Sequence, residues 1–110
     1  MGDRPTTSAE RRLLSPALLL LLAEEPSHGY VLEERLAPLM RTPLSAGSVY
    51  RELRRLEASG AVTSAWEMAD DRAGPRRRYQ VTAFGMQRLE QAVGDMASLL
   101  EALDHLLLDR

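Results

Sequence analysis

The chain has 110 residues, a hydrophobic fraction of 45% and a formal net charge of −2. This length predicts a single domain, and the hydrophobic fraction excludes a chain that is disordered throughout. There is no cysteine, which excludes a disulfide framework and a thiolate metal site and fits a reducing cytoplasm.

The charge is unevenly distributed along the chain. Residues 41–79 contain eight arginines and five acidic residues, whereas residues 14–40 and 80–110 are both net acidic. Phosphate contacts act over roughly a Debye length of about 10 Å, so a local basic face can bind a polyanion even on an acidic chain. All fourteen basic residues are arginine, which codon bias in a GC-rich genome and the recognition of phosphates and guanine edges both explain.

The first part of the chain predicts a flexible polar arm over residues 1–12, followed by a buried helix. Ser15 and Pro16 have the residue types of an N-cap and a first helical position, and the residues that follow are apolar on almost every side to about Glu24. The leucine run superficially resembles a signal peptide. However, Pro16 interrupts it, acidic residues follow at once, and it is far shorter than the ~20 residues of a membrane span.

Two more helices are expected before the basic segment ends. Ser27 or His28 is expected to cap the second helix, which extends to about Leu39. Ser45 is expected to cap the third helix, and Gly60 is expected to end it as a C′ glycine.

The third helix has one apolar side and one basic side. Val49, Leu53 and Leu56 recur at helical spacing, and the arginines lie on the other side. Such a helix could be an ordinary solvated surface helix. Its small first residues, however, would let it approach a groove wall, and its N-terminal N–H groups could hold a phosphate. The expected DNA contacts of this helix are Ser45, Ser48, Tyr50, Arg51, Arg54 and Arg55.

A basic hairpin is expected after the third helix. Residues 62–66 and residues 77–81 alternate as strands, and arginines flank the turn between them. The turn could simply aid solubility, but its charge favours a DNA-binding wing with contacts from Arg72, Arg76 and Arg77. Trp66 and Tyr79 are expected in the core, because the inward face of the strands must cover three helices.

The last helix is expected to begin near Thr82 or Ala83 and to continue to the end of the chain. From Met86 to Leu107 its apolar residues recur at alternating steps of three and four, the a/d pattern of a coiled coil. At 1.5 Å per residue this helix is about 40 Å long, more than the small core can cover. We therefore expect a homodimer whose interface contains Leu89, Val93, Met96, Leu100, Leu103 and Leu107.

Little in the sequence favours catalysis or metal binding. His28 and His105 are far apart and have too few companions for a metal site. No motif marks a serine as activated, and there is no glycine-rich phosphate loop. We therefore expect a protein that is not an enzyme, with no catalytic residue, metal or cofactor.

Three elements, taken in order, are characteristic of one family. They are Pro26-Ser27-His28-Gly29-Tyr30, then Gly47-Ser48-Val49-Tyr50, then the wing Gly74-Pro75-Arg76-Arg77-Arg78-Tyr79. With them the chain resembles PadR-type transcriptional regulators from about Leu14 to Leu107. The predicted fold is α+β and mostly helical: a winged helix-turn-helix of three helices and a two-stranded wing in residues 13–82, then a dimerisation helix in residues 83–110.

The resemblance implies a homodimer that represses transcription until a small-molecule effector binds. A two-fold dimer predicts a pseudo-palindromic site on double-stranded DNA. Some relatives hold flat aromatic ligands between the subunits, against an aromatic residue of the last helix, where this chain has Met96. The residues alone leave a second hypothesis open, a protein-interaction module that acts through its C-terminal helix. Salt separates the two, since DNA binding weakens steeply with salt.

Overall fold

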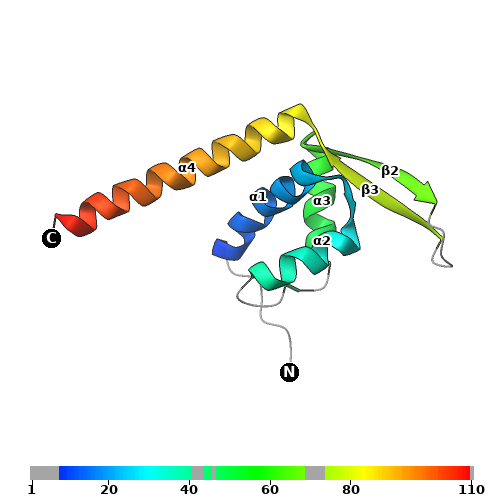
Figure 1. The fold of residues 1–110 in the computed structure, drawn as a ribbon, viewed down its shortest axis with the longest axis horizontal. Coiled ribbons are helices and arrows are strands. Elements are labelled where there is room, and N and C mark those ends of the chain that lie inside the picture. Colours follow the sequence, from blue (N-terminus) through cyan, green and yellow to red (C-terminus); the bar gives the residue numbers. More distant parts are fainter. Residues whose placement is uncertain (1–7, 41–43, 46, 69–73, 110) are drawn as a thin grey trace, which may run out of the picture.

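The computed structural model describes residues 8–40, 44–45, 47–68 and 74–109 of the chain. These residues form four α-helices and a three-stranded antiparallel sheet (Figure 1). The elements are α1 Ser8–Glu24, β1 Ser27–His28, α2 Gly29–Leu36, the 3-10 turn η1 Ala37–Leu39, α3 Ser48–Ala58, β2 Val62–Met68, β3 Pro75–Val81 and α4 Ala83–Leu108. The predicted fold class is confirmed, with β1 as a third strand.

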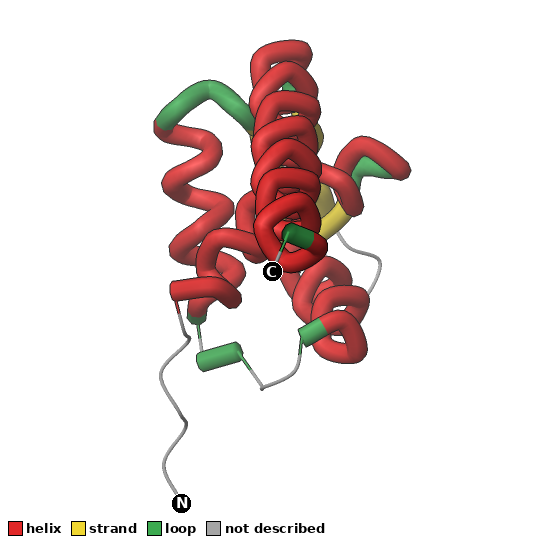
Figure 2. Tube along the Cα trace, turned by 90° about the vertical axis from the view of Figure 1, so that its left-hand side faces the viewer, coloured by secondary structure: helices red, strands yellow, loops and turns green. Residues whose placement is uncertain are grey.

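The core lies where α1, α2 and α3 pack together, and the wing and α4 extend from it in opposite directions (Figure 1). Its most deeply buried large side chains are Leu18, Leu22, Leu32, Leu36, Val49, Leu53 and Val62. In the view of Figure 2, α4 projects toward the reader in front of this body. The burial of α1 is confirmed for most of its leucines, although Leu13 and Leu20 are about half exposed. No helix in the described part of the chain is long and apolar enough to cross a membrane.

The start of α1 differs from the prediction. The helix begins at Ser8, so the predicted cap at Ser15 is wrong and residues 8–12, expected in the arm, are helical. Pro16 lies inside the helix, where it removes one backbone hydrogen bond and crowds the preceding turn. Leu14 and Leu18, on either side of Pro16, are both buried in the core, so tertiary packing maintains the helix. The rest of the expected arm, residues 1–7, lies outside the described residues.

Ser27 and His28 form strand β1 instead of capping α2 with a side chain. They pair antiparallel with the middle of β3, which gives the sheet order β1-β3-β2. His28 does occupy the N-cap position of α2, but its side chain makes no capping hydrogen bond. The second helix is also shorter than predicted, because α2 ends at Leu36 and continues as η1 across Pro38.

A glycine leads into α3. Gly47 is the N-cap residue and has a φ of 82°, in the left-handed region that glycine adopts without strain, so the predicted cap at Ser45 is wrong. Ser45 instead forms a turn: its carbonyl accepts from the Ser48 N–H at 3.1 Å, and the two hydroxyls lie 2.5 Å apart. At the other end Gly60 has a φ of 84°, which confirms the predicted C′ glycine.

The start of α4 is fixed against the end of α3 by four residues, which we call the α4 junction: Gly60, Ala61, Thr82 and Gly85. Helix α4 begins where it was predicted to, and Thr82 caps it, because the Thr82 Oγ1 accepts from the Gly85 N–H at 3.0 Å. The same hydroxyl donates to the Gly60 carbonyl at 2.6 Å, and the Thr82 N–H donates to the Ala61 carbonyl at 3.0 Å. A Cβ at Gly85 would collide with that Ala61 carbonyl oxygen. The junction therefore sets the direction in which α4 leaves the core.

Candidate nucleic-acid interface

Helix α3 separates its apolar and basic residues onto two sides, as predicted. Val49 and Leu53 are fully buried and Leu56 is nearly so, which anchors the helix in the core. The three arginines are exposed; they are Arg51, Arg54 and Arg55. The amphipathic period of 3.6 residues thus presents a basic surface on a helix that the core holds in place.

The first turn of α3 joins small hydroxyls to an arginine. An Nη2 of Arg51 donates to the Ser48 hydroxyl at 3.4 Å, and Ser48 in turn contacts Ser45. One turn farther on, the guanidinium of Arg55 lies 3.7 Å from the carboxylate of Glu52. Arg55 is nevertheless highly exposed, so this ion pair leaves most of its donors accessible to a phosphate.

Tyr50 links α3 to the start of α2. Its ring lies so close to Gly29 that a Cβ there would be 2.5 Å from Cε1 of Tyr50. Burial raises the pKa of the Tyr50 phenol above its ordinary value of 10.0, and the nearby carboxylate of Glu33 raises it further. The hydroxyl is therefore neutral at physiological pH and can donate a hydrogen bond.

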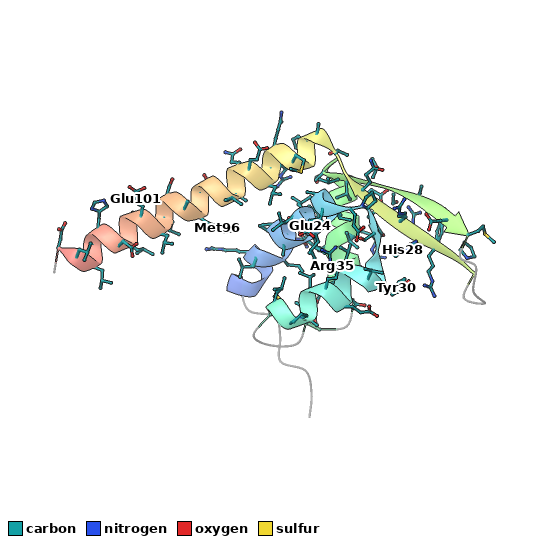
Figure 3. All side chains as sticks on the ribbon, viewed as in Figure 1. Glu24, His28, Tyr30, Arg35, Met96 and Glu101 are labelled. Carbon is teal, nitrogen blue, oxygen red and sulfur yellow. The ribbon has the colours of Figure 1, made fainter. Side chains whose placement is uncertain are left out.

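An aromatic and basic groove of about 440 Å³ lies between α3 and the wing. The guanidinium of Arg76 lies over the Tyr30 ring, 4.5 Å from its centroid, and the His28 ring is stacked 5.8 Å from the same ring. Figure 3 labels His28 and Tyr30 beside the strands of the wing. The groove is lined by His28, Gly29, Tyr30, Tyr50, Trp66, Arg76, Arg77 and Tyr79.

The two aromatic residues that were predicted in the core have different environments. Tyr79 is 4% exposed, which confirms its place in the core. Trp66 is 65% exposed, so its prediction is wrong. The period of two does place Trp66 on the same face of β2 as the buried Val62, but Trp66 lies farther out along the wing than the packed helices reach.

Arg77, one of the predicted DNA contacts, is also hydrogen-bonded within the protein. Its Nη1 donates to the Ser64 hydroxyl at 2.5 Å, and that hydroxyl donates to Oε2 of Glu57 at 2.7 Å. We call this set, Glu57, Ser64 and Arg77, the α3–wing relay. Sequence reasoning missed the role of Ser64, because only the strand register brings Ser64 between the charges of Arg77 and Glu57. Arg72 lies outside the described residues.

A second ion-pair cluster holds the wing on the side of β1. Glu67 of β2 lies 3.2 Å from Nε2 of His28 and 3.8 Å from Nε of Arg78. A separate ion pair lies within the helical body, where Arg35 of α2 donates to Glu24 at the end of α1 at 2.7 Å (Figure 3). The wing is therefore connected to the body through both α3 and β1.

The apolar seam of α4 is mostly uncovered in the single chain. Leu89 is 6% exposed and belongs to the core of its own chain. The other five predicted dimerisation residues are exposed by 38% or more: Val93, Met96, Leu100, Leu103 and Leu107. Leu99 and Leu106, which the a/d pattern omitted, are exposed beside them. Figure 3 shows Met96 and Glu101 on different sides of α4.

Comparisons with known proteins agree on one family. The model of the transcriptional regulator PadR-like family matches residues 18–91. A PadR family transcriptional regulator from Eggerthella lenta is 31% identical, with a TM-score of 0.72, over 88% of this chain and 84% of that one. A PadR-like regulator from Bacillus cereus is 22% identical, with a TM-score of 0.76, over 92% and 97% of the two chains. A comparison with curated protein sequences found no match.

A third solved structure is similar over almost its whole length. It is a conserved protein of unknown function described as a potential transcriptional factor, 32% identical with a TM-score of 0.70. The similarity covers 99% of this chain and 96% of that one. At that coverage the similarity extends over both the core helices and α4.

Proposed function

The chain belongs to the PadR-like family of transcriptional regulators, and from this premise we propose that it is a homodimeric repressor that binds a pseudo-palindromic DNA site in the cytoplasm. The observation that carries the proposal is the basic side of α3, exposed beside a wing and anchored by a buried apolar side. Winged helix-turn-helix proteins place such a helix in the major groove.

In this proposal α3 reads bases and the wing positions the protein on the backbone. Arg51 and Arg54 lie on the exposed side of α3, and bidentate contacts of arginine to guanine are the commonest specific contacts in the major groove. The hydroxyls of Ser45 and Ser48 at the start of the helix, and the phenol of Tyr50, are suited to phosphate oxygens. Arg76 of the wing then holds the flanking backbone.

The dimer forms through α4, and a two-fold dimer requires two related half-sites on the DNA. The support is the exposed apolar seam that begins at Val93 and ends at Leu107. An effector would bind between the two subunits, where Met96 offers a flexible apolar wall. Its binding would change the angle between the two α3 helices and release the DNA.

Selection of bound duplexes from a random DNA pool tests the proposal. We expect the selected sequences to contain two inverted half-sites about one helical turn, roughly 34 Å, apart or a multiple of that. Their affinity should fall steeply with salt. A short asymmetric footprint would contradict the two-fold mode of binding. A protein that enriches no DNA, but captures a protein partner through α4 regardless of salt, would support the interaction module instead.

A further inference from the structure

The α3–wing relay connects three separate elements through one hydroxyl. Glu57 belongs to the last turn of α3, Ser64 to β2 and Arg77 to β3. Arg77 and Glu57 are 3.8 Å apart at their closest atoms, too far for a good hydrogen bond, so Ser64 supplies the link. Removing Ser64 would therefore break the link between Arg77 and Glu57 without removing any charge.

The polarity of the relay is fixed by its ends. A carboxylate can only accept and a guanidinium can only donate, so the single proton of the Ser64 hydroxyl must point to Glu57. Both bonds then involve a charged group, which makes them stronger than neutral hydrogen bonds. The Arg77 side chain is 40% exposed, so the attraction between the charges of Arg77 and Glu57 contributes little to stability. The relay acts instead by fixing the relative position of the three side chains.

Trp66 holds the same guanidinium from the wing side. Arg77 lies over its ring, 4.7 Å from the centroid, and the two residues are cross-strand partners in the β2–β3 pair. This cation–π contact orients the guanidinium toward α3. Arg76, one residue earlier, takes a different course and lies over Tyr30 near the start of α2.

We propose that Arg77 is a positioning residue that sets the angle of the wing relative to α3, and that it does not itself contact DNA. The inference rests on the proposed DNA binding. Two elements that must engage one duplex lose less freedom on binding if their relative position is already fixed. The relay fixes the position of the wing relative to the C-terminal end of α3. That end of the helix is itself held in the core by the buried Leu53 and Leu56.

The test compares substitutions of Arg77 and Ser64 on the duplex that the wild-type protein selects from a random pool. Arg77→Lys keeps the charge but loses the planar, stacked donor, so it should weaken binding as much as Arg77→Gln does. We expect about tenfold for each, equivalent to about 1.4 kcal/mol, with an unchanged salt slope. Ser64→Ala should have the same effect. Arg88→Gln is the matched control, because it removes one charge from an exposed position of α4, outside the relay and the wing, and should weaken binding much less.

A second readout uses the free protein. Trp66 is the one tryptophan of the chain, so its fluorescence reports the stack directly. Quenching by neutral acrylamide should rise in Arg77→Gln and Arg77→Lys, because the guanidinium no longer covers one face of the ring. Circular dichroism should show the same helical content and melting behaviour as the wild type. Unchanged quenching would overturn the inference.

The affinity data can also overturn it. If Arg77→Lys binds like the wild type while Arg77→Gln lowers the salt slope by about one unit, Arg77 contacts a phosphate and the inference is wrong. If the wild-type protein binds no duplex, the proposed function fails. If the wild type binds DNA and both Arg77 variants bind it as tightly as the wild type does, the inference alone fails.

Discussion

Replacing Leu100 and Leu103 by glutamate should convert the proposed dimer to monomers. Both side chains lie in the middle of the exposed part of the α4 seam, where they are 61% and 53% exposed in the single chain. Full burial of a leucine contributes about 1.5–3 kcal/mol, so covering the exposed part of each contributes roughly 1–2 kcal/mol. A two-fold interface contains each residue twice, so about 3–7 kcal/mol of association free energy is at stake.

This free energy corresponds to an increase of about two to five orders of magnitude in the dimer dissociation constant. The buried carboxylates add a further penalty, because an unpaired charge in a desolvated seam is costly. Sedimentation velocity over a concentration series around the micromolar range measures the change. We expect dimers for the wild type and monomers, some of them partly unfolded, for the double variant.

The matched control adds two charges to the other side of the same helix. Gln91→Glu with Ser98→Glu changes exposed residues that lie away from the seam, so the dimer should persist. A wild type that sediments as a monomer at micromolar concentration would refute the reasoning. Equal dissociation constants for the seam variant and the wild type would refute it as well.

Three further predictions follow from the site and the core. Arg51→Ala or Arg54→Ala should reduce the free energy of DNA binding by about 1–3 kcal/mol and relax the base preference at one position of the site. Arg76→Ala should instead weaken binding to all DNA sequences alike and reduce the slope of affinity against salt by about one unit. Affinities for selected and scrambled duplexes at several salt concentrations measure both effects. Gly85→Ala should destabilise the protein by about 1–2 kcal/mol, because the collision of the new Cβ with Ala61 outweighs the gain in helix propensity. Gly94→Ala, which has open space around it, should stabilise the protein by up to about 1 kcal/mol. Urea denaturation measures the free energy of unfolding of both variants. Burial, and then the carboxylate of Glu57, raise the pKa of the Tyr79 phenol above 10.0 in the folded protein. As pH rises past about 10, the phenol therefore loses its proton more readily in the unfolded chain than in the folded one, and the free energy of unfolding should fall. Melting temperatures between neutral and strongly alkaline pH should show that fall in the wild type and a smaller one in Tyr79→Phe.

The elements with a strong periodic signal could be predicted from the sequence. Val49, Leu53 and Leu56 recur every three to four residues, so the buried side of α3 follows from spacing alone. The glycine at position 60 and the threonine at position 82 marked helix ends correctly, because each supplies a local geometry that does not depend on the rest of the fold. The long seam of α4 is predictable for the same reason.

Features that depend on distant parts of the chain could not be predicted. Strand β1 has two residues and no period, and it exists because β3 offers it a free edge. Period-two alternation assigns Trp66 to a face of the sheet but cannot say where the helices stop covering that face. Likewise, the contacts of Arg77 with Trp66 and Ser64 exist because the register places Trp66 opposite Arg77 and Ser64 between Arg77 and Glu57. Pro16 misled the prediction of α1 since packing on both sides of it outweighs its local preference.

The α4 junction also sets a length scale for the assembly. Helix α4 has 26 residues and is therefore about 39 Å long, and its first turn is hydrogen-bonded to the residues that end α3. It acts as a lever arm: a rotation of about 10° at the junction would move its far end by about 7 Å, roughly two base-pair steps of 3.4 Å. In a dimer joined through α4, the spacing of the two half-sites is thus determined by the packing around Gly85, far from any base. A substitution at the α4 junction would then change the spacing of the half-sites without changing any arginine of α3.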